Sequence, residues 1–192
     1  MVKENMSRNE RKPMILVFAG PNGSGKTTIT SFFEMVGNYT NADELTRQAG
    51  ISNLEAAKLV DKRRYESIQK IEDFTFETVL SSKYKLDILE VAKNSGYFIK
   101  CVFVLTADPS INILRVNARV AAGGHSVDRD KIISRYYKAL ANIPKLMELC
   151  DILHVYDNTE TPVRIIRKHK EDISIFPNVL WSENKIKELI GE

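Results

Sequence analysis

The stretch Met14-Ile-Leu-Val-Phe-Ala-Gly-Pro-Asn-Gly-Ser-Gly-Lys-Thr-Thr28 decides the fold of this 192-residue chain. Six apolar residues come first, a glycine-rich turn follows, and Lys26-Thr-Thr28 opens a helical segment. A strand, a glycine loop and a helix in this order, with the spacing Gly-x-x-x-x-Gly-Lys-Thr, predict a P-loop that binds nucleotide phosphates. The alternative is a glycine turn without a ligand, which would require neither the lysine nor the hydroxyl group.

Each part of this loop has a chemical task. Glycines let the backbone curl with its N–H groups pointing inward, which a β-carbon would hinder. Lys26 supplies a positive charge for the β- and γ-phosphates, and the Thr27 hydroxyl group is suited to bind Mg²⁺. The residues predicted to bind the nucleotide are Gly20, Pro21, Asn22, Gly23, Ser24, Gly25, Lys26, Thr27 and Thr28.

Length and composition indicate one ordinary globular domain. The chain has 43% hydrophobic and 28% charged residues, enough for a core without disulfides or structural metal. Cys101 and Cys150 lie in apolar contexts and are predicted to be buried thiols. We expect a P-loop core over about residues 13–160 and a C-terminal extension over about residues 161–192.

The distribution of apolar and charged residues bears on location and partners. The first apolar run ends in the glycine loop after six residues, so neither a signal peptide nor a membrane span is predicted, and we expect a cytoplasmic protein. The net charge is only +3. Anionic substrates or solvation explain the basic residues as well as nucleic acid does, so a nucleic-acid partner is not expected. Those near the two ends are Lys3, Arg8, Arg11, Lys12, Arg164, Arg167, Lys168 and Lys170.

Strand-like and helix-like segments alternate along the chain. The alternation predicts an α/β fold with three layers, in which helices cover both faces of a central, mainly parallel sheet. Ligands of such sheets bind at the carboxyl ends of the strands. The predicted strands are Ile15–Ala19, Asn38–Thr40, Phe74–Thr78, Phe98–Leu105 and Ile152–Tyr156, with a hairpin between Pro162 and Phe176. The predicted helices begin near Ser52, Ser82, Asp108, Asp128, Pro144 and Glu183.

Missing motifs exclude several classes of P-loop protein. The chain has no Asn-Lys-x-Asp motif of a GTPase and no Leu-Ser-Gly-Gly-Gln-like signature of a transporter ATPase. The strand Phe98–Leu105 is followed by the single acid Asp108 rather than by an acidic pair, which argues against a hexameric motor. Because Asp108 precedes Pro109, it is predicted to cap a helix rather than to reach Mg²⁺.

Carboxylates follow two of the predicted strands. Asp43 lies just beyond Asn38–Thr40, where it could act as the general base for a hydroxyl group that attacks the γ-phosphate, or could cap a helix over 44–48. Glu77, with Thr78, Ser81 and Ser82 nearby, could bind the hydroxyl and amide groups of a sugar. The alternative is that Glu77 merely ends a strand and that the two serines cap the next helix.

The segment Arg115-Val-Asn-Ala-Arg-Val-Ala-Ala-Gly-Gly-His125 predicts a lid. Arg115 and Arg119 are one helical turn apart and share a face, and the glycine pair then ends the helix. Arginines in such a lid stabilise charge on the phosphoryl group during transfer. Arg115 could instead be a solvated helix charge, and His125 an exposed loop histidine.

With these pieces assembled, the chain resembles the zeta toxin family, in its short single-domain branch. The resemblance covers about residues 13–158 and depends on the glycine loop, Asn41-Ala-Asp43, Phe76-Glu-Thr78, the segment from Arg119 to Val127, Arg135-Tyr136 and Val155-Tyr-Asp-Asn158. It implies a kinase that transfers the γ-phosphate of Mg²⁺-ATP to the 3′-hydroxyl of the amino sugar of UDP-N-acetylglucosamine. It also implies a small antitoxin protein that blocks the ATP site.

The resemblance assigns a role to each matching position. It makes Lys26 and Thr27 the phosphate and metal residues, Asp43 the base, Glu77 a sugar contact and Arg119 a phosphate-binding arginine. The second arginine of the family falls at His125, with Arg135 as a substitute, and Val79 stands where the family has a hydroxyl residue. Asn158 is predicted to lie beside the adenine.

Two other functions stay open. One is a kinase that acts on another nucleotide or on a nucleic-acid 5′-hydroxyl group. The other is a regulatory module that binds ATP and signals through a partner. The acids Asp43 and Glu77 at two strand ends favour an acceptor pocket, and therefore a kinase.

Overall fold

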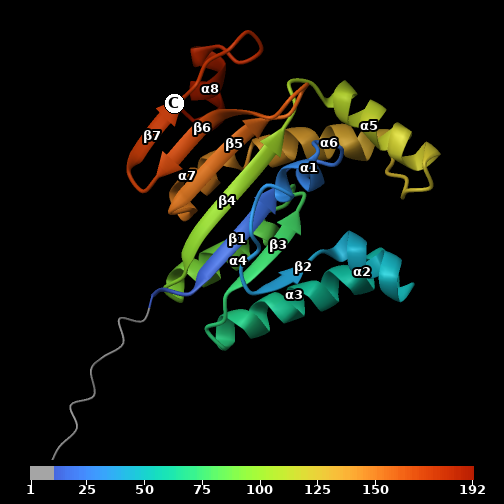
Figure 1. Ribbon diagram of the computed structural model, residues 1–192, viewed down its shortest axis with the longest axis vertical. Helices are drawn as coiled ribbons and strands as arrows, with labels where there is room; N and C mark the ends of the chain where they lie inside the picture. Colours follow the sequence, from blue (N-terminus) through green and yellow to red (C-terminus); the bar gives the residue numbers. More distant parts are fainter. Residues whose placement is uncertain (1–10) are drawn as a thin grey trace, which may run out of the picture.

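The computed structural model describes residues 11–192, apart from the side chains of Gln48 and Asn53. Lys3 and Arg8, two of the basic residues near the N-terminus, lie outside this range. The described residues form a seven-stranded sheet in the order β2-β3-β1-β4-β5-β6-β7 (Figure 1). The first five strands are parallel, whereas β6 and β7 add to the sheet in antiparallel fashion. The strands are β1 Met14–Ala19, β2 Asn38–Thr40, β3 Phe74–Thr78, β4 Phe98–Leu105, β5 Ile152–Asp157, β6 Val163–His169 and β7 Asp172–Ile175.

The helices of the described residues connect these strands. They are α1 Lys26–Thr30, α2 Ala42–Ala49, α3 Asn53–Gln69, α4 Tyr84–Asn94, α5 Pro109–Ala121, α6 Arg129–Leu140, α7 Ile143–Leu149 and α8 Glu183–Ile190. The α/β fold with a mainly parallel central sheet is confirmed. The predicted hairpin is also confirmed, as β6 and β7, so residues beyond 160 extend the same sheet.

The capping residues explain where the helices begin. Ser52 and Glu55 form the reciprocal capping box that opens α3, in which the Glu55 carboxylate also accepts from the Ser52 backbone N–H at 3.0 Å. Asp108 caps α5 by accepting from Ser110 N at 2.7 Å, which confirms the predicted cap. By contrast, no side chain caps α4, whose N-cap residue is Lys83, so capping by Ser81 or Ser82 is wrong.

The two faces of the sheet are covered unequally. The larger core lies between the sheet and the layer that contains α3, α4, α6, α7 and α8, and it includes both cysteines, buried as free thiols. The smaller core contains Leu16, Phe18, Ile29, Val102 and Val104, under α1 and the turn that follows it. In the view of Figure 1, β4 to β7 face the reader with no helix in front of them. The second helical layer is therefore thin.

The position of the central strand determines where a ligand site lies. β1 pairs in parallel with β3 on one side and with β4 on the other, so the glycine loop leaves the middle of the sheet at the carboxyl ends of the strands. The residues after β2, β3, β4 and β5 reach the same edge. No helix within residues 11–192 has the length and apolar character needed to cross a membrane.

Candidate active site

The glycine loop between β1 and α1 has a shape that residues with a β-carbon cannot adopt. Gly20, Gly23 and Gly25 have positive φ angles of 142°, 77° and 86°. A β-carbon at Gly20 would lie 2.0 Å from the Val104 carbonyl oxygen, and one at Gly25 would lie 2.1 Å from Asn158 Nδ2. Both the backbone conformation and the packing therefore require glycine.

Side chains from distant elements hold this loop in place. Asn112 Nδ2 of α5 donates to the Asn22 carbonyl oxygen at 2.6 Å, and Arg135 Nη1 of α6 donates to Asn22 Oδ1 at 3.2 Å. Asn158 Nδ2 donates to the Ser24 carbonyl oxygen at 2.9 Å. The amide nitrogen of Asn158 is thus bonded to the loop, and its predicted contact with adenine stays a prediction.

Lys26 lies at the start of α1 and points back over the loop. Its Nζ donates to the carbonyl oxygens of Gly20 at 2.8 Å and Pro21 at 3.2 Å. Burial lowers the pKa of Lys26, and the carboxylates of Glu77 and Asp43 oppose this shift. An ammonium group held by two carbonyl oxygens is suited to exchange them for the more strongly accepting oxygens of a phosphate.

Unused polar atoms beside the loop fit an anionic ligand. Within residues 11–192, Ser24 Oγ and Arg115 Nη1 are buried and have no hydrogen-bond partner. Arg115 Nη2 is anchored by the Thr159 carbonyl oxygen at 2.9 Å, so the guanidinium group is fixed beside Gly25. Since an unpaired buried donor is costly, both atoms fit a site in which a phosphate group would pair with them.

The hydroxyl group of Thr27 is the candidate metal ligand. The Thr27 side chain is exposed at the first turn of α1. In the described part of the chain, no group of three or more His, Cys, Asp and Glu side chains could hold a metal ion by itself. This arrangement fits Mg²⁺, which keeps several waters and takes further ligands from substrate phosphates.

Of the predicted lid residues, Arg119 acts on the glycine loop through its charge, whereas the His125 side chain forms no hydrogen bond to the loop within residues 11–192. Arg119 is exposed, and its Nη2 donates to the His125 carbonyl oxygen at 3.1 Å, across the turn at Gly123 and Gly124. The positive charge of Arg119 lowers the pKa of Lys26, so the two groups act on each other. The His125 side chain is exposed, and its backbone rather than its ring makes the contact.

Asp43 lies in the first turn of α2 but does not cap it. The cap is Asn41, whose Oδ1 accepts from Asp43 N at 3.0 Å and from Glu44 N at 3.4 Å. The alternative that Asp43 serves as the helix cap is therefore wrong. The Asp43 carboxylate makes no hydrogen bond within residues 11–192, and its charge raises the pKa of Lys26. An exposed carboxylate whose charge acts on Lys26 fits the predicted general base.

A chain of hydrogen bonds joins Asn41 to the other candidate carboxylate. Tyr39 Oη donates to Glu77 Oε1 at 2.7 Å and accepts from Asn41 Nδ2 at 3.1 Å. Burial raises the pKa of Tyr39, and the bond to Glu77 raises it further. Asn41 therefore orders two things at once: the helix that carries Asp43 and the phenol that fixes Glu77.

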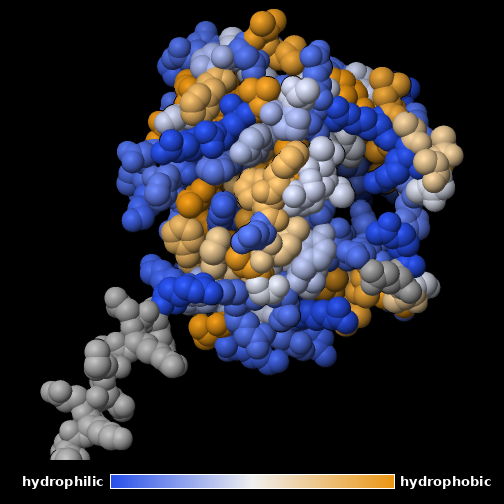
Figure 2. Space-filling view, viewed as in Figure 1, coloured by the Kyte–Doolittle hydropathy of each residue, from blue (hydrophilic) through white to orange (hydrophobic). Residues whose placement is uncertain are grey.

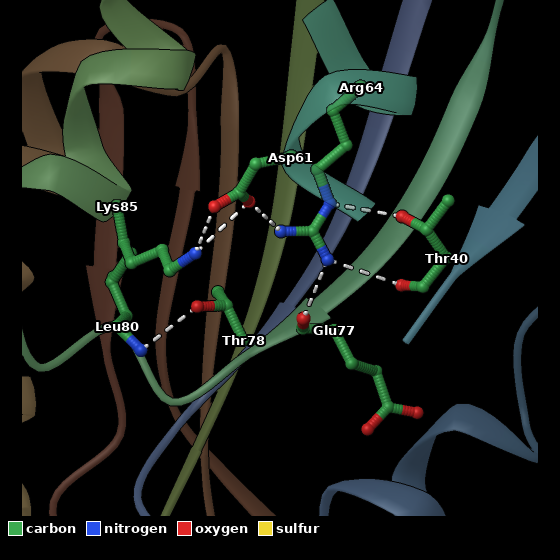
Figure 3. Close-up of polar contacts among 7 residues, drawn as sticks. All are labelled: Thr40, Asp61, Arg64, Glu77, Thr78, Leu80 and Lys85. Carbon is green, nitrogen blue, oxygen red and sulfur yellow. Dashed lines mark hydrogen bonds and ion pairs between the residues drawn. The ribbon is translucent and has the colours of Figure 1, made fainter. Parts of the chain in front are cut away.

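Arg64 of α3 reaches between the ends of β2 and β3 and bonds to both (Figure 3). It is 2% exposed, and its guanidinium group donates to Thr40 Oγ1 at 3.0 Å, to the Thr40 carbonyl oxygen at 3.4 Å and to the Glu77 carbonyl oxygen at 3.3 Å. Asp61 accepts from it at 2.9 Å and also binds Lys85 at 2.8 Å. Burial lowers the pKa of Arg64 to about 10, although Asp61 opposes the shift.

In Figure 3, the Glu77 side chain points away from this guanidinium group. Arg64 therefore holds the Glu77 backbone and leaves the carboxylate free for other contacts. The guanidinium carbon also lies 4.4 Å from the centroid of the Phe76 ring, which fixes its plane.

The hydroxyl residues near Glu77 differ in their contacts. Thr78 Oγ1 accepts from Leu80 N at 3.1 Å, and the Thr78 carbonyl oxygen accepts from Gly20 N at 3.2 Å, so Thr78 connects β3 to the glycine loop. Ser81 is half-buried and follows directly. Thr78 thus has a structural task, which does not depend on a substrate.

Three residues that surround the site were not assigned to it from the sequence. The sequence leaves Arg115 open between a lid arginine and a solvated helix charge, and Tyr39 and Arg64 give no signal of their own. A tyrosine two residues before Asn41 and an arginine within an amphipathic helix are common patterns. Only the sheet order β2-β3-β1 shows that they meet Glu77.

The site can be compared with known proteins. A model of the zeta toxin family matches residues 2–171. An uncharacterised protein of Haemophilus influenzae is 28% identical over 127 residues, which are 63% of this chain and 91% of that protein.

Solved structures share the fold. A crystal structure of AvrRxo1-ORF1 with AvrRxo1-ORF2 and ATP superimposes with a TM-score of 0.72 at 14% identity, over 93% of this chain and 64% of that chain. This chain thus spans slightly less than two thirds of that one. A structure from the PezAT toxin–antitoxin system of Streptococcus pneumoniae gives 0.58 at 17% identity, over 98% and 92% of the two chains. Because the family model covers most of the sequence and the fold agrees with it, this chain belongs to the zeta toxin family and has the fold of a P-loop kinase.

Proposed function

We propose that this protein is a cytoplasmic, Mg²⁺- and ATP-dependent kinase, which transfers the γ-phosphoryl group of ATP to a sugar hydroxyl group of UDP-N-acetylglucosamine. One observation carries the proposal. The carboxylates of Asp43 and Glu77, from the ends of two neighbouring strands, both act on the ammonium group of Lys26. This supports a site in which Asp43 is the proposed base, Glu77 the proposed acceptor contact and Lys26 the proposed phosphate contact.

Each side chain has a task in the proposed reaction. The acceptor oxygen forms a bond to the γ-phosphorus, the bond from that phosphorus to the bridging oxygen of ADP breaks, and Asp43 takes the proton of the hydroxyl group. Lys26, Arg119 and Arg135 offset the negative charge on the transferred group. Mg²⁺ held by Thr27 supplies further charge neutralisation when it is bound.

Glu77 is proposed to select the acceptor. Its Oε1 already accepts from Tyr39, so Oε2 is available to a hydroxyl or amide N–H of the sugar. A site whose polar groups pair with such donors discriminates against acceptors that lack them. Ser81 and His125 are proposed to line the same acceptor side.

The test measures the product directly. The pure protein is incubated with Mg²⁺-ATP and UDP-N-acetylglucosamine, and a monophosphorylated sugar nucleotide is sought by mass spectrometry. Glu77→Ala should weaken use of the acceptor far more than binding of ATP. Asp43→Asn serves as the control that binds both substrates without transfer.

A second acceptor class is favoured by two departures from the family pattern. Val79 replaces a hydroxyl residue, and the exposed His125 replaces an arginine. If the sugar is not phosphorylated while another nucleotide or a nucleic-acid 5′-hydroxyl group is, the kinase proposal stands and the sugar proposal fails. ATP hydrolysis with no acceptor at all would favour the regulatory module.

We also propose a small antitoxin protein as a partner. One structure that shares the fold comes from a system described as toxin–antitoxin. Co-expression of the product of an adjacent small reading frame should give a complex that survives purification and loses ATP binding. A complex that binds ATP normally would contradict this proposal.

A further inference from the structure

The uncovered face of the sheet over β4, β5 and β6 gathers basic residues. Leu153 and Val155 of β5 point into the larger core, so His154 between them points to the opposite face. Burial, which is the larger cause, and the positive charges around its ring together lower the pKa of His154 to about 4. These charges belong to Arg164, Lys100, Arg167 and His169. We call Lys100, His154, Arg164 and Arg167 the basic face. In sequence these residues are dispersed, and the fold brings them together.

The charges of the basic face are not neutralised by neighbouring acids. Lys100, Arg164 and Arg167 form no ion pair within residues 11–192, where the recorded salt bridges all lie elsewhere. Two of them are held over aromatic rings instead: Lys100 Nζ lies 5.2 Å from the centroid of Phe33, and Arg164 Cζ lies 5.4 Å from that of Phe176. Two acids lie in register near this face: Asp157 is opposite Val163 and accepts from Thr159, and Asp172 is opposite His169 at the far side.

Two polar atoms of the basic face lack partners. In the part of the chain that the structure describes, His154 Nδ1 and Arg164 Nε are buried without a hydrogen bond. Buried polar atoms are normally paired, so each unpaired one needs an explanation. Two such atoms on one uncovered surface, among unneutralised cations, point to an anionic ligand with acceptor oxygens.

An aromatic cavity adjoins the basic face. It has a volume of about 390 Å³ and is lined by Ile29, Phe32, Phe33, Tyr156 and Pro162. Tyr156 links it to the cations, because its ring centroid lies 6.3 Å from that of His154. Phe32 is 74% exposed, so its ring is accessible to a ligand. Figure 2 views this side and shows hydrophobic groups beside strongly hydrophilic ones.

We propose that the basic face and this cavity together bind single-stranded nucleic acid, with phosphates on Lys100, Arg164 and Arg167 and a base against Phe32 and Tyr156. Cations along a surface combined with rings on which bases stack are the physical requirements for binding a single strand. An acidic protein segment would use the cations, but it would leave the aromatic cavity without a planar partner. The binding does not require phosphoryl transfer.

The test is fluorescence anisotropy with a labelled, unstructured 12-nucleotide RNA, measured at several salt concentrations. Arg164→Gln combined with Arg167→Gln should weaken binding at low salt by about tenfold or more and reduce the slope of log affinity against log salt by about 1.4. Phe32→Ala should weaken binding by about five- to hundredfold. The matched control is Lys62→Gln with Arg63→Gln, two exposed cations of α3, which should change little.

Further measurements separate this inference from the kinase. Lys26→Ala, which should lower transfer by about 10²- to 10³-fold, should bind the RNA normally. Absence of binding by the wild type, equal loss in the α3 control, or equal affinity for a duplex would each overturn the proposal. Displacement of the RNA by Mg²⁺-ATP would also overturn it, because the cavity would then belong to the ATP base. Thermal unfolding of each variant should match the wild type.

Discussion

The glycine loop and the edge formed by β2 and β3 lie two strands apart at most, yet their shapes depend on different features. The glycine loop needs residues without a β-carbon, because β-carbons at Gly20 and Gly25 would collide with atoms of residues 104 and 158, and side chains of distant elements then hold it. The acceptor edge is shaped by side chains, because Arg64, Tyr39 and Asn41 bond its carbonyl, carboxylate and helix end. We expect substitutions at the acceptor edge to change use of the acceptor more than binding of ATP.

The largest effect is expected at Asp43, which lies on the acceptor edge. Asp43→Asn keeps the size of the side chain, and Asn41 remains the cap of α2, so stability should change little. Transfer should fall by about 10²- to 10⁴-fold because the amide cannot accept a proton. Rapid-quench measurement of product formation, with ATP affinity measured in parallel, checks this. A rate near that of the wild type would exclude Asp43 as the base.

Lys26 tests the loop itself. Lys26→Ala removes the ammonium group but none of the glycines, so the fold should persist. Transfer should fall by about 10²- to 10³-fold, the usual cost of losing one group that stabilises the transferred charge. Steady-state kinetics with ATP as the varied substrate provide the measurement. Activity within about threefold of the wild type would contradict a kinase that uses this loop.

Substitutions of Arg64 should affect the acceptor edge and leave the glycine loop unchanged. Arg64→Leu removes three donors from the ends of β2 and β3 and should cost about 3 kcal/mol of stability, at the low end for a broken buried pair because Lys85 still neutralises Asp61. Arg64→Lys keeps the positive charge but lacks the planar set of N–H donors of the guanidinium group, and it should lower the free energy of unfolding less than Arg64→Leu does. In Arg64→Lys, kcat/KM for the acceptor should fall by about tenfold while the KM for ATP stays constant.

The two KM values distinguish a positioning role from a general structural one. A parallel rise in both, or a loss of ATP affinity alone, would show that Arg64 does not act on the acceptor edge selectively. Chemical denaturation with urea gives the stability of each variant on the same samples.

The smallest effect is expected at Tyr39. Tyr39→Phe removes one hydrogen bond to Glu77 and one from Asn41 but keeps the ring. Because Glu77 would be less well oriented, kcat/KM for the acceptor should fall by about three- to tenfold, the size of one hydrogen bond. Competition assays between two acceptors check whether discrimination falls too. Unchanged discrimination would mean that Glu77 does not need this support.

The sequence predicted the parts of the molecule that depend on local patterns. The bounds of β2, β3, β4 and α8 agree with the structure, because each is a short run with clear ends. The glycine loop is also predictable from a local pattern, because the spacing of its glycines, lysine and threonine is what phosphate binding requires.

The acceptor edge was less accessible to prediction. The sequence offered Asp43 as the cap of α2, but Asn41, two residues earlier, has the extended backbone that a cap requires. From the sequence alone, Arg64 is an ordinary charged residue of a helix. The order of the strands brings it to Thr40 and Glu77. These contacts join residues that are far apart in sequence, and no local pattern encodes them.

The bond between Asn158 and the glycine loop has a consequence for how the protein is made. On the ribosome, the loop emerges first, yet β1 must await β3 and β4 before it gains either neighbour. Asn158 follows still later, after β5. The loop is therefore encoded early and completed late, so a nascent chain becomes able to hold a nucleotide only when most of the domain has been synthesised.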